Sequence, residues 1–391
     1  CYAAFRRCAS GIAGAPAIQL RMEHYLASRG VDVHATGIVS SILGYYGKDY
    51  TFSLPILSML VVCNVLDKKA LKEIPQLPFE LTLLPLALYR FFNLQVVSYA
   101  IPALVAVGIF LFKHKPNPNP VAAFVRKKST APALQKLTKM MPGSGGFLEA
   151  IPLTAFVAMC LVRSGYADHL VVEKGMKFLR NLQRTDGSWP IDTNLSTWVT
   201  TLSIKALGPR IADVMTENQR ERLRNHLMEN QYKVPHPFNH ARPGGWGWTS
   251  FSGSVPDADD TAGAILALLT LEPDGSRVKT AVLDGCNWLG SLQNRDGGIP
   301  TFCKGWGRLP FDASCADLTG HAVLAWLKAV EKYDSLPVSA QERNEIRTLK
   351  GQINLALRFL EKTQRSDGAW LPLWFGNQHT VDKTNPVYGT A

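Results

Sequence analysis

The residues best suited to chemistry are three aspartates at the start of an apolar segment. Asp257, Asp259 and Asp260 follow Pro256, and residues 262–271 are mostly good helix formers. A proline followed by acids predicts a helix that begins near Asp257. The ordinary role of such acids is to cap the helix and to interact with its dipole, and for these residues by themselves that interpretation stays open.

Carboxylates crowded this closely repel one another unless one of them keeps its proton. Like charges nearby and apolar surroundings both raise the pKa of a carboxyl group. We therefore expect one un-ionised aspartic acid, which could protonate a group as weakly basic as a carbon–carbon double bond. An Asp-Asp-x-x-Asp site for ionising a diphosphate would need an acid where Gly263 stands, so neither a metal nor another cofactor is expected.

A second group of polar residues lies further along the chain. Asp317 and His321 are spaced i,i+4, which places them on one face of an expected helix, and Asp312 lies shortly before them. A lone histidine on an apolar helix is more often a core residue than a catalyst. Both interpretations stay open at this point.

Internal repeats indicate the elements that position these residues. A segment of helical periodicity that ends in Gln, with Gly at the fourth position beyond it, occurs at Gln183, Gln293 and Gln364, and more weakly at Gln231. Each copy predicts an amphipathic helix that ends at a glycine turn. Strands are nearly unsupported. We predict an all-α fold in which alternating inner and outer helices close into α/α barrels.

Two of these patterns resemble a known family. The Asp-x-Asp-Asp-Thr-Ala segment 257–262, preceded by Pro-Gly-Gly-Trp-Gly-Trp at 243–248, resembles the catalytic segment of squalene–hopene cyclases, the class II triterpene cyclases. The repeat resembles their glutamine–tryptophan repeat. In such a repeat we expect Gln to cap the end of its helix and to stack on the Trp of the next repeat. Ile299 replaces that Trp in one copy, which should loosen the link.

The resemblance also implies a role for each acid. Asp259 would protonate the substrate, while Asp257 and Asp260 would sustain its protonation. A charged His321 would donate a hydrogen bond to Asp259 and stabilise the carboxylate left after proton transfer. The supporting acids behind the histidine would be Asp312 and Asp317.

Aromatic side chains would then stabilise the carbocation. Each desolvated cation–π contact contributes about 1–2 kcal/mol. On the resemblance, the aromatic residues that face the substrate would be Trp248, Phe302, Trp374, Tyr99 and Tyr388. Core packing explains any one of them equally well.

Glycine-rich and proline-rich stretches predict the division into domains. The Gly143–Gly146 break is our expected boundary. We expect an N-terminal α/α-barrel domain over 1–142, incomplete at its start. A catalytic α/α-barrel domain with the repeats would follow over 143–391, incomplete at its C-terminus.

Composition limits the partners. The chain has 42 Lys and Arg against 31 Asp and Glu, a net charge of +11, which favours attraction to anionic lipid head groups. Nucleic acid is not expected, because no nucleic-acid-binding motif occurs. The seven cysteines lack metal-ligand spacing and predict reduced thiols. The apolar run 94–112 could span a membrane by length, but Pro102 and Gly108 interrupt it and favour a buried helix.

We therefore predict a terpene cyclase of the squalene–hopene type, an isomerase of hopanoid biosynthesis. It would protonate a terminal double bond of squalene or a related linear polyprene and guide cationic cyclisation to a hopene-like triterpene. Its expected place is the cytoplasmic face of a bacterial membrane, as a monotopic protein, and a homodimer is left open. The alternatives are a class II diterpene cyclase and a non-catalytic α/α-barrel that binds ligands or proteins.

Overall fold

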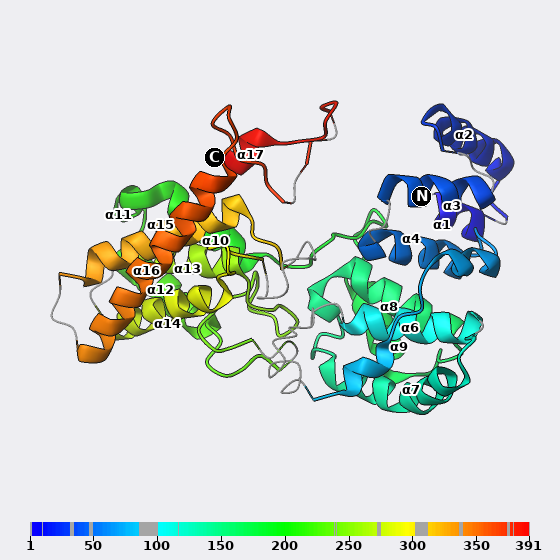
Figure 1. The fold of residues 1–391 in the computed structure, drawn as a ribbon, viewed down its shortest axis with the longest axis horizontal. Coiled ribbons are helices and arrows are strands. Elements are labelled where there is room, and N and C mark those ends of the chain that lie inside the picture. The colour runs from blue at the N-terminus through cyan, green and yellow to red at the C-terminus, as the bar shows by residue number, and fades with distance from the viewer. Residues whose placement is uncertain are drawn as a thin grey trace. The chain divides into compact units, whose positions relative to one another are not determined.

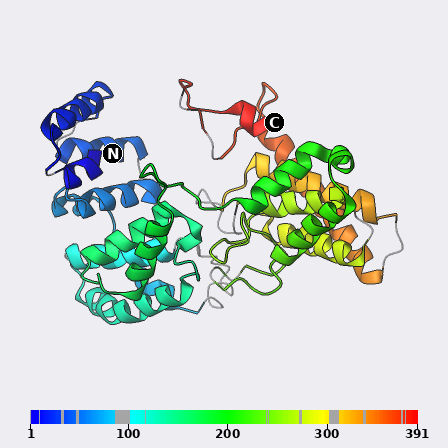
Figure 2. The same cartoon turned by 180° about the vertical axis from the view of Figure 1, so that it is seen from behind.

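The structure is a computed structural model, and the described residues form helices joined by turns and loops (Figures 1 and 2). Within them, β pairing is limited to the isolated bridges Trp246–Asp257 and Ile299–Cys315. The predicted all-α class is confirmed. The residues described are 2–9, 11–31, 35–46, 50–85, 101–115, 117–237, 239, 241–271, 275–301, 312–335, 339–373, 376–377 and 379–390.

The chain divides into two compact units, one of residues 1–85 with 100–191 and the other of 192–391 with 86–99. The expected boundary at 142/143 therefore falls inside the first unit. The reason is that α8 and α9 pack with α6 and α7 instead of joining the later helices. These four helices span Ile101–His114 (α6), Pro120–Met140 (α7), Ile151–Arg163 (α8) and Leu170–Asn181 (α9).

The first unit is organised around α6, whose middle is buried against α8 and the short helix η2. A Cβ at Gly108 would lie 2.8 Å from Cβ of Phe79, so glycine is what lets η2 pack this closely. None of the helices described is long and apolar enough to cross a membrane. The other elements of this unit are α1 (Tyr2–Cys8), α2 (Ala15–Ser28), α3 (Ala35–Tyr46), α4 (Tyr50–Val62), η1 (Lys68–Glu73), η2 (Phe79–Leu83) and η4 (Phe147–Glu149).

The second unit is a two-layer array of helix pairs. The inner helices α10, α13 and α15 pack side by side, and α12, α14 and α16 alternate with them along the chain to form the outer layer. This is the α/α arrangement predicted from the repeats. The bounds are α10 (Ser196–Leu207), η5 (Gly208–Arg210), α11 (Ile211–Val214), α12 (Glu217–Asn230), α13 (Ala258–Leu271), α14 (Ser276–Leu292), α15 (Ala316–Tyr333), α16 (Ala340–Thr363) and α17 (Pro386–Thr390).

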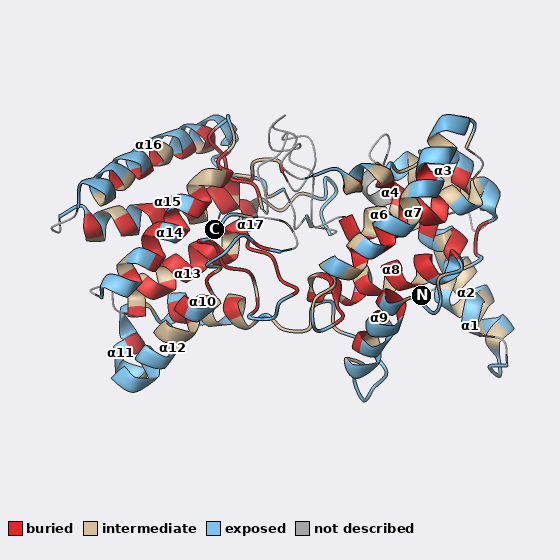
Figure 3. Ribbon diagram, turned by 90° about the horizontal axis from the view of Figure 1, so that it is seen from below, coloured by how far each residue is buried: buried red, intermediate tan, exposed pale blue. Residues whose placement is uncertain are grey.

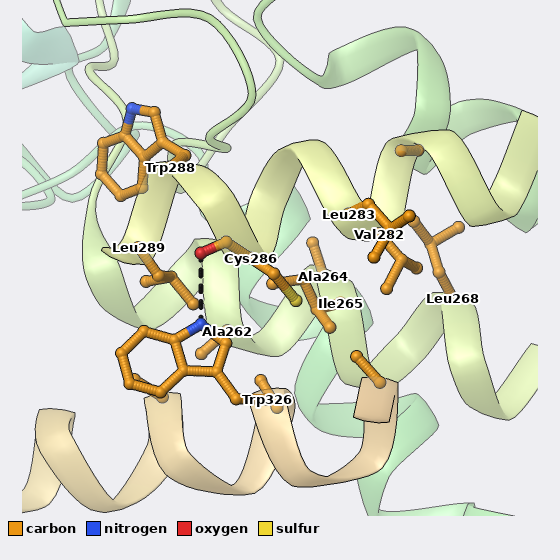
Figure 4. Close-up of a cluster of buried hydrophobic side chains, with 14 of the residues drawn as sticks. Ala262, Ala264, Ile265, Leu268, Val282, Leu283, Cys286, Trp288, Leu289 and Trp326 are labelled. Carbon is orange, nitrogen blue, oxygen red and sulfur yellow. Dashed lines mark hydrogen bonds between the residues drawn. The ribbon is translucent and has the colours of Figure 1, made fainter. Parts of the chain in front are cut away.

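Burial follows these layers. Most of α13 is buried, whereas the outer helix α16 buries one face and exposes the other (Figure 3). Between α13, α14 and α15 lies an apolar core in which Nε1 of Trp326 donates to the carbonyl of Cys286 at 3.2 Å (Figure 4). Each large side chain buried there contributes about 1.5–3 kcal/mol. The core thus fixes the starts of α13 and α15 relative to each other.

The repeat glutamines link neighbouring helices by hydrogen bonds. Nε2 of Gln231 donates to the carbonyls of Gly244 and Ala281, at 2.8 and 2.9 Å. Nε2 of Gln293 donates to Gly297 and Gln352, both at 2.9 Å. The weaker copy at Gln231 therefore makes the same two kinds of hydrogen bond as the copy at Gln293. In each copy one of the bonds reaches the backbone of the next outer helix.

The repeat tryptophans also donate hydrogen bonds. Nε1 of Trp246 donates to the carbonyl of Leu227 at 2.6 Å, and Nε1 of Trp370 donates to Leu360 at 2.8 Å. Each indole thus ties a glycine turn to the helix that precedes it. Ile299 lacks this donor, yet it is fully buried and the hydrogen bonds of its repeat's Gln keep normal lengths.

Glycine pairs let each turn approach the outer helix. Gly244 has φ +114°, and a Cβ there would lie 2.6 Å from the carbonyl oxygen of Asp284. A Cβ at Gly245 would lie 2.7 Å from the Trp288 ring. Only glycine adopts this φ without strain and leaves room for both contacts. In the first unit the same pair of contacts occurs for Gly145 and Gly146, with the carbonyl of Lys174 and the ring of Phe178. Gly297 likewise faces the carbonyl of Leu355, while a Cβ at Gly298 would overlap Cβ of Ser314.

Candidate active site

Asp257 caps α13. Its Oδ1 accepts the backbone N–H of Asp260 at 2.8 Å, which is the hydrogen bond of a helix N-cap. Its own N–H donates to the carbonyl of Trp246 at 3.0 Å, and Oγ1 of Thr261 accepts the N–H of Trp246 at 3.0 Å. These hydrogen bonds attach the first turn of α13, which carries the acids, to Trp246 of the Gly-Gly-Trp turn.

Burial raises the pKa of two of the three acids. The Asp257 carboxyl has its pKa raised well above the usual range, first by burial and then by the charge of Asp260. Burial also raises the pKa of Asp260, to about 7. Oδ2 of Asp257 and Oδ1 of Asp260 have no hydrogen-bond partner within the described residues. Both observations favour an uncharged carboxylic acid at Asp257 and, below about pH 7, at Asp260.

Asp259 lies on the open side of the same turn and pairs with His321. Its Oδ1 is 2.6 Å from Nδ1 of His321, and the two side chains are 25% and 15% exposed. Nε2 of His321 is buried and finds no partner in the described part of the chain. The structure thus brings together the acid and the histidine singled out in the sequence, although Asp259 is the least buried of the three acids.

The start of α15 lies beside this pair. The thiol of Cys315 donates to Oδ1 of Asp317, and the backbone N–H of Leu373 donates to the same sulfur at 3.4 Å. Asp312 is 1% exposed, and its carbonyl accepts Nδ2 of Asn294 at 2.9 Å. Cys315 is the residue that sequence reasoning missed here. The signal was the spacing shared by Cys-Ala-Asp-Leu-Thr at 315–319 and Asp-Ala-Asp-Asp-Thr at 257–261.

Of the five predicted aromatic residues, the structure describes Trp248 and Tyr388. Trp248 lies in the loop before α13, and its carbonyl accepts the N–H of Thr197, at the start of α10, at 3.0 Å. Tyr388 lies on α17, which packs against α15, and burial together with the charges of Asp317 and Asp259 raises its pKa. Three predicted positions fall outside the described residues: Tyr99, Phe302 and Trp374.

Comparison with known sequences supplies the family. The sequence model of the squalene–hopene cyclase C-terminal domain matches residues 195–391, half of the chain. The chain belongs to the squalene–hopene cyclase family. The match contains α13 and α15, and therefore both halves of the Asp259–His321 pair.

Individual members of the family are more distant. The squalene–hopene cyclase of Alicyclobacillus acidocaldarius is 25% identical over 280 residues, which cover 68% of this chain and 42% of that protein. Enfumafungin synthase of Hormonema carpetanum is 29% identical over 240 residues, 56% of this chain and 17% of that protein. The chain therefore spans less than half the length of these curated relatives.

Among solved structures, the type II terpene cyclase MstE from Scytonema is 14% identical, with a TM-score of 0.29 over 68% of this chain and 70% of that chain. The family assignment depends on the sequence match at 195–391.

Proposed function

We propose that this protein protonates a terminal double bond of squalene or a related linear polyprene and directs its cationic cyclisation to a hopene-like triterpene. The observation that carries the proposal is the 2.6 Å contact between Asp259 and His321, beside two buried acids of raised pKa. Membership of the squalene–hopene cyclase family supports the same chemistry.

The geometry suggests which atoms act. We assign Nδ1–H of His321 as the donor to Oδ1 of Asp259, 2.6 Å away, so the proton to be transferred would sit on Oδ2. When the Oδ2–H bond breaks, the alkene π electrons form a new C–H bond and the neighbouring carbon becomes a tertiary cation. The carboxylate left behind keeps the His321 hydrogen bond, which is stronger to a charged acceptor.

The two buried acids would keep negative charge low around Asp259. While they are protonated, Asp257 and Asp260 add no carboxylate that would trap the cation or compete for the proton. Cation–π contacts of about 1–2 kcal/mol each, from Trp248, Tyr388 and the other predicted aromatics, would then hold positive charge through successive ring closures.

Incubation with squalene tests this function. In D2O, a cyclised product should carry one deuterium, because the Asp259 proton exchanges with solvent before transfer. Mass spectrometry would detect a product of the substrate's composition plus this label, and Asp259→Asn should abolish it. If the intact protein yields no cyclic product, or if Asp259→Asn cyclises at the wild-type rate, the proposal is wrong.

The same assay separates the alternatives. Cyclisation of geranylgeranyl diphosphate but not of squalene would support a class II diterpene cyclase. Saturable binding of a polyprene without conversion would support a non-catalytic α/α barrel. The site favours the squalene-type reaction, since the family match covers both halves of the acid–histidine pair.

We further propose that the protein binds the cytoplasmic surface of a bacterial membrane without crossing it. The exposed residues Val121, Phe124 and Val125 lie at i, i+3 and i+4 near the start of α7, and the exposed Lys127 and Lys128 follow them. Apolar side chains beside lysines suit the boundary between acyl chains and anionic head groups. The net charge of +11 adds to this attraction.

Vesicle sedimentation tests this second proposal. Phosphatidylserine vesicles should retain the protein better than phosphatidylcholine vesicles, and Phe124→Ser should weaken retention. Exchange of Leu324, which is also exposed but lies on α15, for Ser is the matched control. Equal retention of all three proteins would contradict the assignment of this surface.

A further inference from the structure

We propose that Cys315 is a positioning residue for proton transfer, whose thiol holds Asp317 and joins the first turn of α15 to the C-terminal segment that carries Tyr388. The inference rests on the proposed cyclase function. It concerns a residue that touches no reacting atom and acts through its neighbours.

The internal repeat defines the place that Cys315 occupies. Its N–H donates to the carbonyl of Ile299 at 3.1 Å, and Oγ1 of Thr319 accepts the N–H of Ile299 at 2.9 Å. Asp257 makes the corresponding bridge to Trp246 at the start of α13. Cys315 therefore stands where the preceding repeat has its capping aspartate, and Asp317 stands where that repeat has the proposed acid.

The thiol replaces the carboxyl group of the capping aspartate with a smaller group that can both donate and accept. It donates to Oδ1 of Asp317 and accepts the N–H of Leu373. Burial and the charge of Asp317 raise the pKa of Cys315 to about 12, so it remains a thiol at neutral pH. An aspartate at 315 would instead place a second carboxylate against Asp317.

The segment held by the thiol leads to Tyr388. The two ends of this segment are joined by a hydrogen bond in which the N–H of Trp370 donates to Oγ1 of Thr390 at 3.0 Å. Leu373 is fixed to the sulfur of Cys315, and α17 packs against α15. Burial and the charges of Asp317, Asp259 and Cys315 raise the pKa of the Tyr388 phenol.

Loss of the thiol should slow the protonation step more than it weakens substrate binding. Misplacement of a catalytic group by about 1 Å can cost on the order of 10²-fold in rate. The long hydrocarbon of the substrate makes most of its contacts elsewhere, so KM should change by less than about twofold. Cys315→Ala should lower kcat about tenfold, and Cys315→Ser, which keeps a donor and an acceptor, should recover most of it.

Cys286→Ala is the matched control. Cys286 is another fully buried thiol in the same unit, on α14, and its backbone carbonyl, not its sulfur, accepts the Nε1–H of Trp326. Its loss should reduce thermal stability without changing kcat. The inference is wrong if Cys315→Ala keeps the wild-type kcat, or if Cys315→Ser is as slow as Cys315→Ala.

Hydrogen exchange gives a measurement that does not depend on turnover. The amide of Leu373 should exchange faster in Cys315→Ala than in the wild type, in Cys315→Ser or in Cys286→Ala. Unchanged exchange would disprove the link even if the wild type cyclises squalene. Conversely, if the wild type forms no cyclic product while Leu373 exchanges faster, the cyclase proposal fails and the link stands.

Discussion

The starts of α13 and α15 are two copies of one structural pattern that carry different chemistry. Both begin with an isolated bridge to a residue that follows a Gly-Gly pair, and both place a threonine hydroxyl against the N–H of that residue. At the capping position α13 has Asp257 and α15 has Cys315. The two helix starts have the same backbone hydrogen bonds but different side chains in their first turns.

The difference suggests a division of labour between the two helices. Asp259 and Asp317 are equivalent, but the next position is the buried Asp260 in α13 and Leu318 in α15. At the position of His321, α13 has Gly263, where a Cβ would lie 2.9 Å from Oγ1 of Thr201 on α10. One copy concentrates acids, and the other supplies the histidine that faces them.

The largest expected effect on cyclisation comes from replacing the two equivalent acids, Asp259 and Asp317, by asparagine. Asp259→Asn should lower the rate of squalene cyclisation about 10²–10⁴-fold, the usual contribution of a general acid. Asp317→Asn should lower it only about tenfold, because in the proposed mechanism Asp317 does not touch the substrate. Product formation per folded protein measures both. Equal losses would mean that the two acids share one role and would remove the proposed asymmetry.

Two of the repeat turns differ in whether an outer helix packs against their glycine. Gly297 has φ +94°, and a Cβ there would overlap the carbonyl of Leu355, whereas Gly368 has φ +83° and no described atom within 4 Å of its Cβ position. Gly297→Ala should cost about 3 kcal/mol and Gly368→Ala about 1 kcal/mol of unfolding free energy. Urea denaturation measures this difference. Similar costs would show that strain in φ alone, without the contact to α16, sets the stability.

The buried Asp260 makes stability depend on pH. Its folded-state pKa of about 7 lies above the ordinary value of 3.8. The contribution of this group to stability is therefore constant below about pH 4, falls as the pH rises to about 7 and is constant again above it. Asp260→Asn should remove part of this fall, on the order of 2 kcal/mol. Denaturation midpoints from pH 4 to 8 check this. A wild-type slope that persists in Asp260→Asn would contradict it.

The smallest effect concerns the repeat glutamines. Gln293 is 6% exposed and donates to two carbonyls, whereas the exposed Gln364 donates to the carbonyl of Gly368. Gln293→Ala should cost about 1–2 kcal/mol because it leaves two buried carbonyls without a donor. Gln364→Ala should cost less than about 0.5 kcal/mol. Thermal unfolding of both variants measures the difference, and a larger loss for Gln364 would reverse the comparison.

Local patterns in the sequence predicted much of this architecture. Helical periodicity and glycine turns indicated the all-α class, and the i,i+4 spacing of Asp317 and His321 placed them on one helix face. Crowding predicted a raised pKa, but burial falls on Asp257 and Asp260, because the helix turns Asp259 toward α15. The boundary at 191/192 depends on packing between helices distant in sequence, which periodicity cannot reveal.

The bridge at each helix start also bears on where the chain tolerates length changes. In one copy the interval between the bridged residues is 247–256, and in the other it is 300–314. The glycine pair, the glutamine link and the threonine hydroxyl all lie outside that interval, and lengthening a loop costs little closure entropy. Insertions could therefore reshape the surroundings of the acid pair while every helix keeps its neighbours.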